Sequence, residues 1–580
     1  MTEEIPNIKG PNHRHRFGRF LALGAVAFEI LLPLRAADTP AATGPTIVLP
    51  PMLVEESKSS VPWYYASVDG TEFLSRCSEF TTWDFVDAWQ SRMQLLKTLV
   101  PPEFLARADV PAVVVLYAQD LDQTISAEIQ HELQADAAKK GDKTDQGRVN
   151  LAPNMRLGDR DMHATIVYID EATFAGAQLS IAPSHVRYLL SGRVPELPAW
   201  LVEGLERLWR GADFAVDPIT FAPMVWRNQD ESDALASDST HPRALLPASE
   251  LFAPEPLRVK ENQNPRRVQT RAAQQELFVR WALVSSEATR AALWKFTARA
   301  AEAPVTEEMF EACFGFDFAE LRDRLSDYLP LAVEDTEWID PGPLPTLPRF
   351  KVERATPNQI ARVRGEWERL AIWHVQRRLP QAREPYIAQA RRTLRRAYNA
   401  GDRDPRLLAI MGLCEIDSGN PAGAREFLEP AIAGGVVRPN AYYEVARLRF
   451  ADLRRDAPET KLFSTTELAP IIRPLQQALK QAPPLPEVFI LLGEAWARCE
   501  ISPSAAEFAE LETGARLFCR RPTVSYPIAL AFARHGKKVE AAEALVACAG
   551  YATDDKTQAG IARLRAELAA TLTRPPSAPP

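Results

Sequence analysis

Small residues recur at a fixed spacing in the C-terminal half of this 580-residue chain. From Leu407 to Gly435 the sequence reads LLAIMGLCEIDSGNPAGAREFLEPAIAGG, which is two apolar helical stretches separated by a short polar turn. Gly412 and Ala424 stand where the two helices of such a hairpin would touch, and Ala446 follows Gly412 after 34 residues. Because small residues let two helix backbones approach closely, this period predicts stacked pairs of antiparallel helices.

The same pattern continues toward the C-terminus. Gly493 lies in VFILLGEAWARCEISPSAAEF, and Ala541 lies in PIALAFARHGKKVEAAEALVAC. The period and the small-residue positions together resemble the tetratricopeptide repeat family, and an unrelated helical bundle with alanine-rich seams is the alternative. The resemblance implies an all-α solenoid over residues 356–573 that binds a protein or peptide partner through its repeats. The helices would pack at Gly412, Ala424, Ala446, Gly493 and Ala541.

A Pro-rich segment, EWIDPGPLPTLPRF, separates this helical half from the rest of the chain. Its four closely spaced prolines predict a stiff linker over residues 336–355. Ahead of it, WYYASVD, VPAVVVLYA and HATIVYID are β-branched and aromatic runs that predict strands. TTWDFVDAWQSRMQLLKTLV and QTRAAQQELFVRWALV carry helical periodicity. We therefore expect an α+β domain over residues 62–335.

The N-terminus has the outline of a secretory signal. Basic residues in HRHRFGR precede the apolar run FLALGAVAFEILLPL, and small residues follow in LRAAD. Glu29 interrupts the apolar run, and a buried helix is the alternative. We expect a signal peptide over residues 1–37, a linker over 38–61 and a disordered tail over 574–580. The protein would then be periplasmic or secreted, without a membrane partner once the signal is removed, since no other apolar run approaches spanning length.

Charge and cysteine content narrow the remaining functions. The formal net charge of −8 provides no basic surface of the kind that nucleic-acid binding requires, so we expect no nucleic-acid partner. The six cysteines are scattered without the spacing of a metal site. Whether Cys499 and Cys519 form a disulfide is left open by the sequence.

The stretch LPAWLVEGLERL, residues 197–208, points to a more specific family. It resembles the peptidase MA-like branch of the gluzincins, in which a Pro-x-Trp-Leu-x-Glu-Gly run carries the third zinc ligand. Glu203 is the matching residue. The resemblance extends over residues 62–335 and implies that a preceding helix should carry the motif His-Glu-x-x-His, whose two histidines bind the metal.

In this chain the corresponding positions have lost the required chemistry. The motif falls on the run PSHVR, so that Pro183, Ser184 and Arg187 replace the first histidine, the glutamate and the second histidine. Proline has no ligand atom, serine is no base near neutral pH, and the arginine cation repels a metal. We therefore predict no catalytic residue, no bound metal and no cofactor, and we interpret Pro183, Ser184, Arg187 and Glu203 as a vestigial site.

Two further expectations follow from this alignment. Arg187 should form a direct salt bridge with Glu203, replacing the link that the metal makes in active relatives. His185 has Leu189 rather than a second histidine four residues later, so we interpret it as a surface or capping residue. The run HELQA, residues 131–135, carries half of a zinc motif within a polar stretch, and we interpret it as coincidence.

The sequence thus predicts an exported, non-catalytic binding or scaffold protein. It would combine a pseudo-metallopeptidase domain with a helical-repeat domain that binds proteins. The alternative is a zinc metallopeptidase with atypical ligands, and a third hypothesis is an assembly factor that uses only the solenoid.

Overall fold

The computed structural model describes residues 62–105, 110–118, 156–179, 181–213, 219–226, 245–253, 265–340, 342, 345–378, 380, 383–458, 460–548 and 555–572. The predicted signal peptide 1–37, the linker 38–61, the HELQA run and the tail 574–580 lie outside the described residues. The described residues belong to one compact unit that begins at Val61.

A mixed six-stranded sheet organises the N-terminal part, in the order β4-β5-β3-β2-β1-β9. Its inner pairs β2–β3 and β3–β5 are parallel, and the outer pairs are antiparallel. The three runs that the sequence predicted as strands form β1, β3 and β5. The strands are β1 (Tyr64–Val68), β2 (Thr71–Ser75), β3 (Ala112–Ala118), β4 (Arg156–Gly158), β5 (His163–Ile169) and β9 (Glu353–Arg354).

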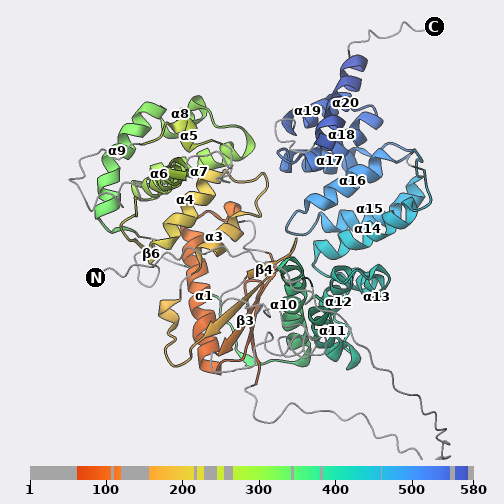
Figure 1. Cartoon of the computed structure of the whole chain (residues 1–580), viewed down its shortest axis with the longest axis horizontal. Helices are drawn as coiled ribbons and strands as arrows, with labels where there is room; N and C mark the ends of the chain where they lie inside the picture. Colours follow the sequence, from red (N-terminus) through yellow and green to blue (C-terminus); the bar gives the residue numbers. More distant parts are fainter. Residues whose placement is uncertain are drawn as a thin grey trace, which may run out of the picture. The chain divides into compact units, whose positions relative to one another are not determined.

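Helices cover both faces of this sheet, which explains why β3 is an almost unbroken apolar run. Val114 and Leu116 pack in one core with residues of α1 (Glu79–Leu99). Their neighbours Val113 and Val115 pack in a second core with residues of α10 (Pro357–Arg378). In Figure 1, β3 accordingly lies between α1 and α10.

The segment predicted as a linker, 336–355, takes part in the six-stranded sheet and in a second, three-stranded sheet. Within it β8 (Glu337–Ile339) pairs with β7 (Ile219–Phe221), and β9 pairs with β1. In the second sheet β7 lies between β8 and β6 (Ala212–Asp213). Helix α10, which the sequence assigned to the repeat domain, contacts β2, β3, β4 and β5. The sheet and the repeats therefore share one continuous hydrophobic core, while the predicted domain boundary stays a prediction.

A second, aromatic-rich core lies among the helices that follow β5. Stacked and edge-on rings of Trp200, Phe252, Phe278, Phe296 and Phe310 fill its centre. The η2 turn (Gly176–Gln178) follows β5 and contacts α1, and β6 packs on this core through Ala212. The helices of this part are α3 (Pro183–Leu190), α4 (Ala199–Arg210), α5 (Ala248–Leu251), α6 (Pro265–Val284), α7 (Glu287–Glu302), α8 (Glu307–Phe314) and α9 (Phe318–Glu334), and the η1 turn (Pro102–Phe104) follows α1.

From α10 onward the described chain forms paired helices. Consecutive helices pack as α10–α11, α12–α13 and α14–α15, and the first helix of each pair also contacts the first helix of the next. Five of the first helices, α10, α12, α14, α16 and α18, begin at a proline, where the missing N–H costs nothing. The remaining bounds are α11 (Arg383–Asn399), α12 (Pro405–Asp417), α13 (Pro421–Ala433), α14 (Pro439–Arg454), α15 (Thr465–Ala478), α16 (Pro486–Ala497), α17 (Ala505–Leu517), α18 (Pro522–Arg534), α19 (Lys538–Cys548) and α20 (Asp555–Leu572).

The small residues identified in the sequence lie at tight helix contacts. A Cβ atom built on Gly412 would lie 2.5 Å from Cγ of Leu428 on the paired helix α13. On Gly493 it would lie 2.8 Å from the backbone carbonyl carbon of Pro527 in α18. Ala424, Ala446 and Ala541 are fully buried. The helical pairing that the 34-residue period predicts is thus present, and α12 and α14 begin 34 residues apart.

Two further observations bear on the sequence predictions. None of the helices in the described part of the chain combines the length and apolarity needed to cross a bilayer. All six cysteines, Cys499 and Cys519 among them, are free thiols.

Candidate functional site

The four residues of the predicted vestigial site lie on α3 and α4, which pack against each other. Nη2 of Arg187 on α3 lies 2.6 Å from Oε2 of Glu203 on α4, so the predicted salt bridge is present. The same guanidinium also donates to Glu206, one turn further along α4. The side chain of Arg187 is 47% exposed and that of Glu203 is 19% exposed, so this arginine cluster lies in contact with water.

The other two residues of the set do not join this cluster. Pro183 is the first residue of α3, and the backbone oxygen of Ser184 accepts a hydrogen bond from Nη1 of Arg156 at 2.7 Å. Glu206 was missed by sequence reasoning, although its spacing of three residues from Glu203 places both carboxylates on one helix face. Within the described ranges, no group of three His, Cys, Asp or Glu side chains is arranged to hold a metal ion. The vestigial reading of these positions stays a prediction.

The interpretation of His185 as a surface or capping residue is wrong. Its side chain is buried, with the ring 5.1 Å from that of Trp89 and 5.7 Å from that of His163. Position 185 faces inward, where its ring contacts those of Trp89 on α1 and His163 on β5. Burial, and then the charge of Arg156, lower the pKa of His185 well below its ordinary value, which keeps the imidazole neutral near pH 7.

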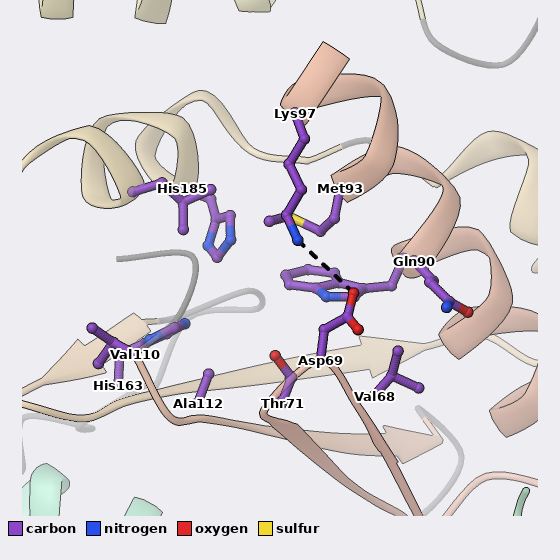
Figure 2. Close-up of a pocket in the computed structure, with 12 residues that line it drawn as sticks. Val68, Asp69, Thr71, Gln90, Met93, Lys97, Val110, Ala112, His163 and His185 are labelled. Atoms are coloured by element: carbon purple, nitrogen blue, oxygen red, sulfur yellow. Dashed lines mark ion pairs between the residues drawn. The ribbon is translucent and has the colours of Figure 1, made fainter. Parts of the chain in front are cut away.

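Figure 2 shows the small cavity that His185 and His163 face. The ion pair between Lys97 and Asp69, 3.9 Å apart, also borders it. The cavity has a volume of about 30 Å³, enough for about one water molecule. It is too small for a peptide or an organic substrate.

A much larger cavity of about 980 Å³ lies beside the repeats, and we call it the groove. One side is formed by β4 with the turn that follows it, residues 156–160, and by the loop between α3 and α4. The opposite side comes from the first helices α10, α12 and α14 and from the start of α16. The groove therefore lies between the edge of the sheet at β4 and the first helices of the repeat.

The turn between β4 and β5 is held against the repeat by buried ion pairs. Arg369 of α10 donates to Asp159 of the turn, to Glu366 and, at 2.8 Å, to Asp417 of α12. Arg438, just before α14, lies 3.1 Å from Asp161 and 3.0 Å from Glu366. These side chains are almost entirely buried, so we call them the buried network.

One backbone hydrogen bond and two further ion pairs also hold the turn on the repeat. The backbone N–H of Asn440, in the first turn of α14, donates to Asp161 at 2.7 Å. A carboxylate at a helix N-terminus is stabilised by the helix dipole. Nε of Arg160 lies 3.0 Å from Oε1 of Glu487 on α16, and its Nη1 lies 3.2 Å from Oε1 of Glu444 on α14. Asp159, Arg160 and Asp161 of the turn thus each form an ion pair with a residue of the repeat.

The pKa values of the two aspartates in the turn are shifted in opposite directions. Burial disfavours the charge on Asp159, but Arg369 and Arg438 outweigh it and lower the pKa of Asp159 to about 2. Burial raises the pKa of Asp161 to about 6, because Arg438 offsets only part of the effect and the charge of Asp159 adds to it. Although burial works against its charge, Asp161 and Glu366 raise the pKa of Arg438 above its ordinary value.

Sequence reasoning did not identify this network. Its partners lie far apart in the chain, 210 residues between Asp159 and Arg369 and 277 between Asp161 and Arg438. The run Gly-Asp-Arg-Asp at 158–161 is typical of a solvated turn. Only the burial of that turn distinguishes it from an ordinary loop.

Comparisons with known proteins add little to this geometry. No family model matches the sequence, and no curated protein matches it either. A search of solved structures found a similarity to the crystal structure of the P58(IPK) TPR domain, with 12% identity over 53% of this chain and 86% of that one. The TM-score is 0.14, so this similarity carries no argument here. The fold itself defines the class of protein. A mixed sheet with its covering helices is joined to a repeat of paired helices.

Proposed function

We propose that this protein is a non-catalytic scaffold that binds an extended segment of a partner protein in the groove. The observation that carries the proposal is the groove itself, a cavity of about 980 Å³ lined by successive first helices of the repeat. Stacked helix pairs of tetratricopeptide type, to which we assign these repeats, present such an inner face to protein ligands.

The lining of the groove suits a peptide. Apolar surface from the half-buried Val194 and the exposed Trp373 lies beside charged side chains. Trp373 is 51% exposed, and a large exposed aromatic side chain in a cavity is a frequent anchor for a bound segment. The chain's own polar turn at 158–161 is already bound to these helices. This supports the capacity of the repeat to bind a polar segment of a partner.

The proposal can be tested by selecting peptides from a displayed random library on the purified full chain. The selected peptides should bind Trp373→Ala about tenfold more weakly, because the aromatic anchor is lost. Trp338→Ala is the matched control, since Trp338 is 62% exposed on β8 and does not line the groove. Peptides that bind both variants as well as the native chain, or a library that yields no binder, would overturn the proposal.

The α+β region is, in our proposal, a pseudopeptidase of gluzincin type. The cluster of Arg187 with Glu203 and Glu206 supports it, because a guanidinium then links the two helices that a metal would link in an active relative. Elemental analysis after dialysis separates this from the alternative, a zinc metallopeptidase with atypical ligands. About one zinc per chain would favour the metallopeptidase, since a site with three protein ligands retains its metal.

Export through residues 1–37 remains part of the proposal. It is tested by sequencing the N-terminus of the mature protein from a fractionated native host. A new N-terminus near residue 38 in the exported fraction supports it, and an intact Met1 in the cytoplasmic fraction contradicts it.

A further inference from the structure

Most arginines that line the groove are neutralised by carboxylates of the chain. Arg160 pairs with Glu444 and Glu487, and Arg369 pairs with the acids of the buried network. Arg447 also pairs with Glu444, and Arg521 pairs with Glu196. Two lining arginines, Arg156 and Arg377, differ from these.

Arg156 carries a charge that the described residues do not balance. Its Nη1 donates to the backbone oxygen of Ser184 at 2.7 Å, and its guanidinium carbon lies 5.6 Å from the ring centre of Tyr188. No described carboxylate forms an ion pair with it, and its buried Nε has no hydrogen-bond acceptor. Burial lowers the pKa of Arg156 to about 10, so it stays charged near neutral pH. A half-buried cation without an anion is unfavourable, and an incoming anion would relieve it.

Arg377 supplies a second cation on the same cavity. It lies near the C-terminal end of α10, two turns beyond Arg369, and its side chain is exposed. It forms no ion pair with any residue that the structure describes. The groove therefore has two arginines available to an anionic ligand, while its other lining arginines are already paired.

We propose that the segment bound in the groove is acidic and that its carboxylates pair with Arg156 and Arg377. This inference rests on the proposed function, since it names the chemistry of the partner for the same groove. Arginine suits the role because its planar donors bind a carboxylate in a bidentate manner.

The remainder of the lining favours a protein segment over a nucleic acid. Asp417, Glu444 and Glu487 also line the groove and already pair with its other arginines, so few cations remain for a ligand that carries a phosphate at every residue. The exposed ring of Trp373 and the half-buried side chain of Val194 provide contacts for apolar residues of a peptide but none for a phosphate backbone. An acidic peptide with apolar residues beside its carboxylates matches both features.

The test uses fluorescein-labelled dodecapeptide libraries with blocked termini and randomised Ala, Leu, Ser and Pro positions. One library has a fixed central Glu-x-x-Glu, the second Gln-x-x-Gln, the third Lys-x-x-Lys, and single-stranded poly(U) is the nucleic-acid probe. Binding to the full chain is measured by fluorescence anisotropy. The Glu library should bind about tenfold more tightly than the Gln library, as expected for a charge-assisted pair, and high salt should weaken it.

Variants of the two arginines then locate the binding. Arg377→Glu should weaken the Glu library about tenfold and strengthen the Lys library, and because Arg377 is exposed this variant should fold normally. Arg156→Gln should weaken the Glu library by a similar factor, while Arg156→Lys, which keeps the charge, should weaken it less. Arg322→Gln is the control, because Arg322 is an exposed arginine of α9 away from the groove.

The outcomes separate this inference from the proposed function. If the Gln library binds as tightly as the Glu library and both weaken in Trp373→Ala, the groove binds peptides and the acidic partner is wrong. If poly(U) binds through Arg156 and Arg377 more tightly than the Glu library, the acidic peptide is also wrong. If no library binds the full chain, both proposals fail.

Discussion

Two arginine clusters each tie separate elements of this molecule together, and they differ in their access to water. In the buried network, Arg369 and Arg438 join the β4–β5 turn to the repeat, with side chains at most 5% exposed. In the other, which we call the exposed cluster, Arg187 joins α3 to α4 through Glu203 and Glu206, with its own side chain 47% exposed. In both clusters a guanidinium is shared between two or more carboxylates.

The same type of ion pair therefore contributes differently to stability in the two clusters. In the exposed cluster Arg187 itself is half exposed and Glu206 keeps a second partner in Arg210, so the loss of one ion pair costs little stability. In the buried network an abandoned carboxylate would remain in a low-dielectric environment, so the loss of one partner is costly. The buried network therefore holds the sheet on the repeat, whereas the exposed cluster adds one ion-pair contact between α3 and α4.

The largest expected effect comes from removing one arginine of the buried network. Arg438→Met leaves Asp161 buried without its main counter-charge and should lower the free energy of unfolding by about 3–5 kcal/mol. The measurement is urea unfolding of the full chain at pH 7. Arg187→Met is the matched control in the exposed cluster and should cost less than about 1 kcal/mol. Equal losses in the two variants would remove the distinction between the clusters.

A second effect is the pH dependence that Asp161 gives to the buried network. Its folded pKa of about 6 lies above its ordinary value of 3.8, so the folded protein favours the protonated acid. The stability that this group contributes is therefore fully present below about pH 4 and is lost as the pH rises through 6. The loss is of the order of 2–3 kcal/mol for a shift of this size.

Unfolding measured at pH 4.5 and at pH 7 tests this expectation. The native chain should lose stability over this interval relative to Asp161→Asn, which cannot ionise. Asp159 does not contribute to this difference, because its pKa is lowered to about 2. The stability that Asp159 provides is lost only at a pH below this interval, as the pH falls toward 2. Parallel pH profiles for the native chain and the variant would show that Asp161 does not titrate in this interval.

The two clusters also show how far the sequence could predict the molecule. The pairing of Arg187 with Glu203 was predictable because a short motif placed the two residues on neighbouring helices 16 residues apart. The 34-residue period likewise predicted the helix pairs, and β-branched runs predicted β1, β3 and β5. These are signals that lie within one or two elements of the chain.

What the sequence did not reveal depends on contacts between distant segments. The docking of Asp159 and Asp161 on the repeat, the packing of α10 on the sheet and the burial of His185 all require the tertiary arrangement. A polar turn and a lone histidine have the same local sequence whether they are buried or exposed. Burial determines how much each charge contributes to stability. It is therefore the property that local sequence patterns predict least well.

A third, smaller effect is the coupling between Arg187 and Glu203 in the exposed cluster. A double-mutant cycle with Arg187→Met and Glu203→Gln should give a coupling energy below about 1 kcal/mol, because the arginine is half exposed. Repeating the cycle in a Glu206→Gln background should increase the coupling, since Arg187 then has a single carboxylate partner. A coupling of several kcal/mol would mean that this cluster behaves like the buried network.

The smallest expected effect is the response of the two clusters to salt. The Debye length falls from about 10 Å at 0.1 M to about 3 Å at 1 M ionic strength, and this screens exposed charges far more than buried ones. The destabilisation caused by Arg187→Met should therefore shrink by a few tenths of a kcal/mol between these two sodium chloride concentrations. The destabilisation caused by Arg438→Met should stay constant, because no ion reaches Asp161 or Glu366, whose side chains are 0% exposed. If the Arg438 effect also shrinks with salt, solvent reaches the buried network, and the difference between the two clusters is one of degree.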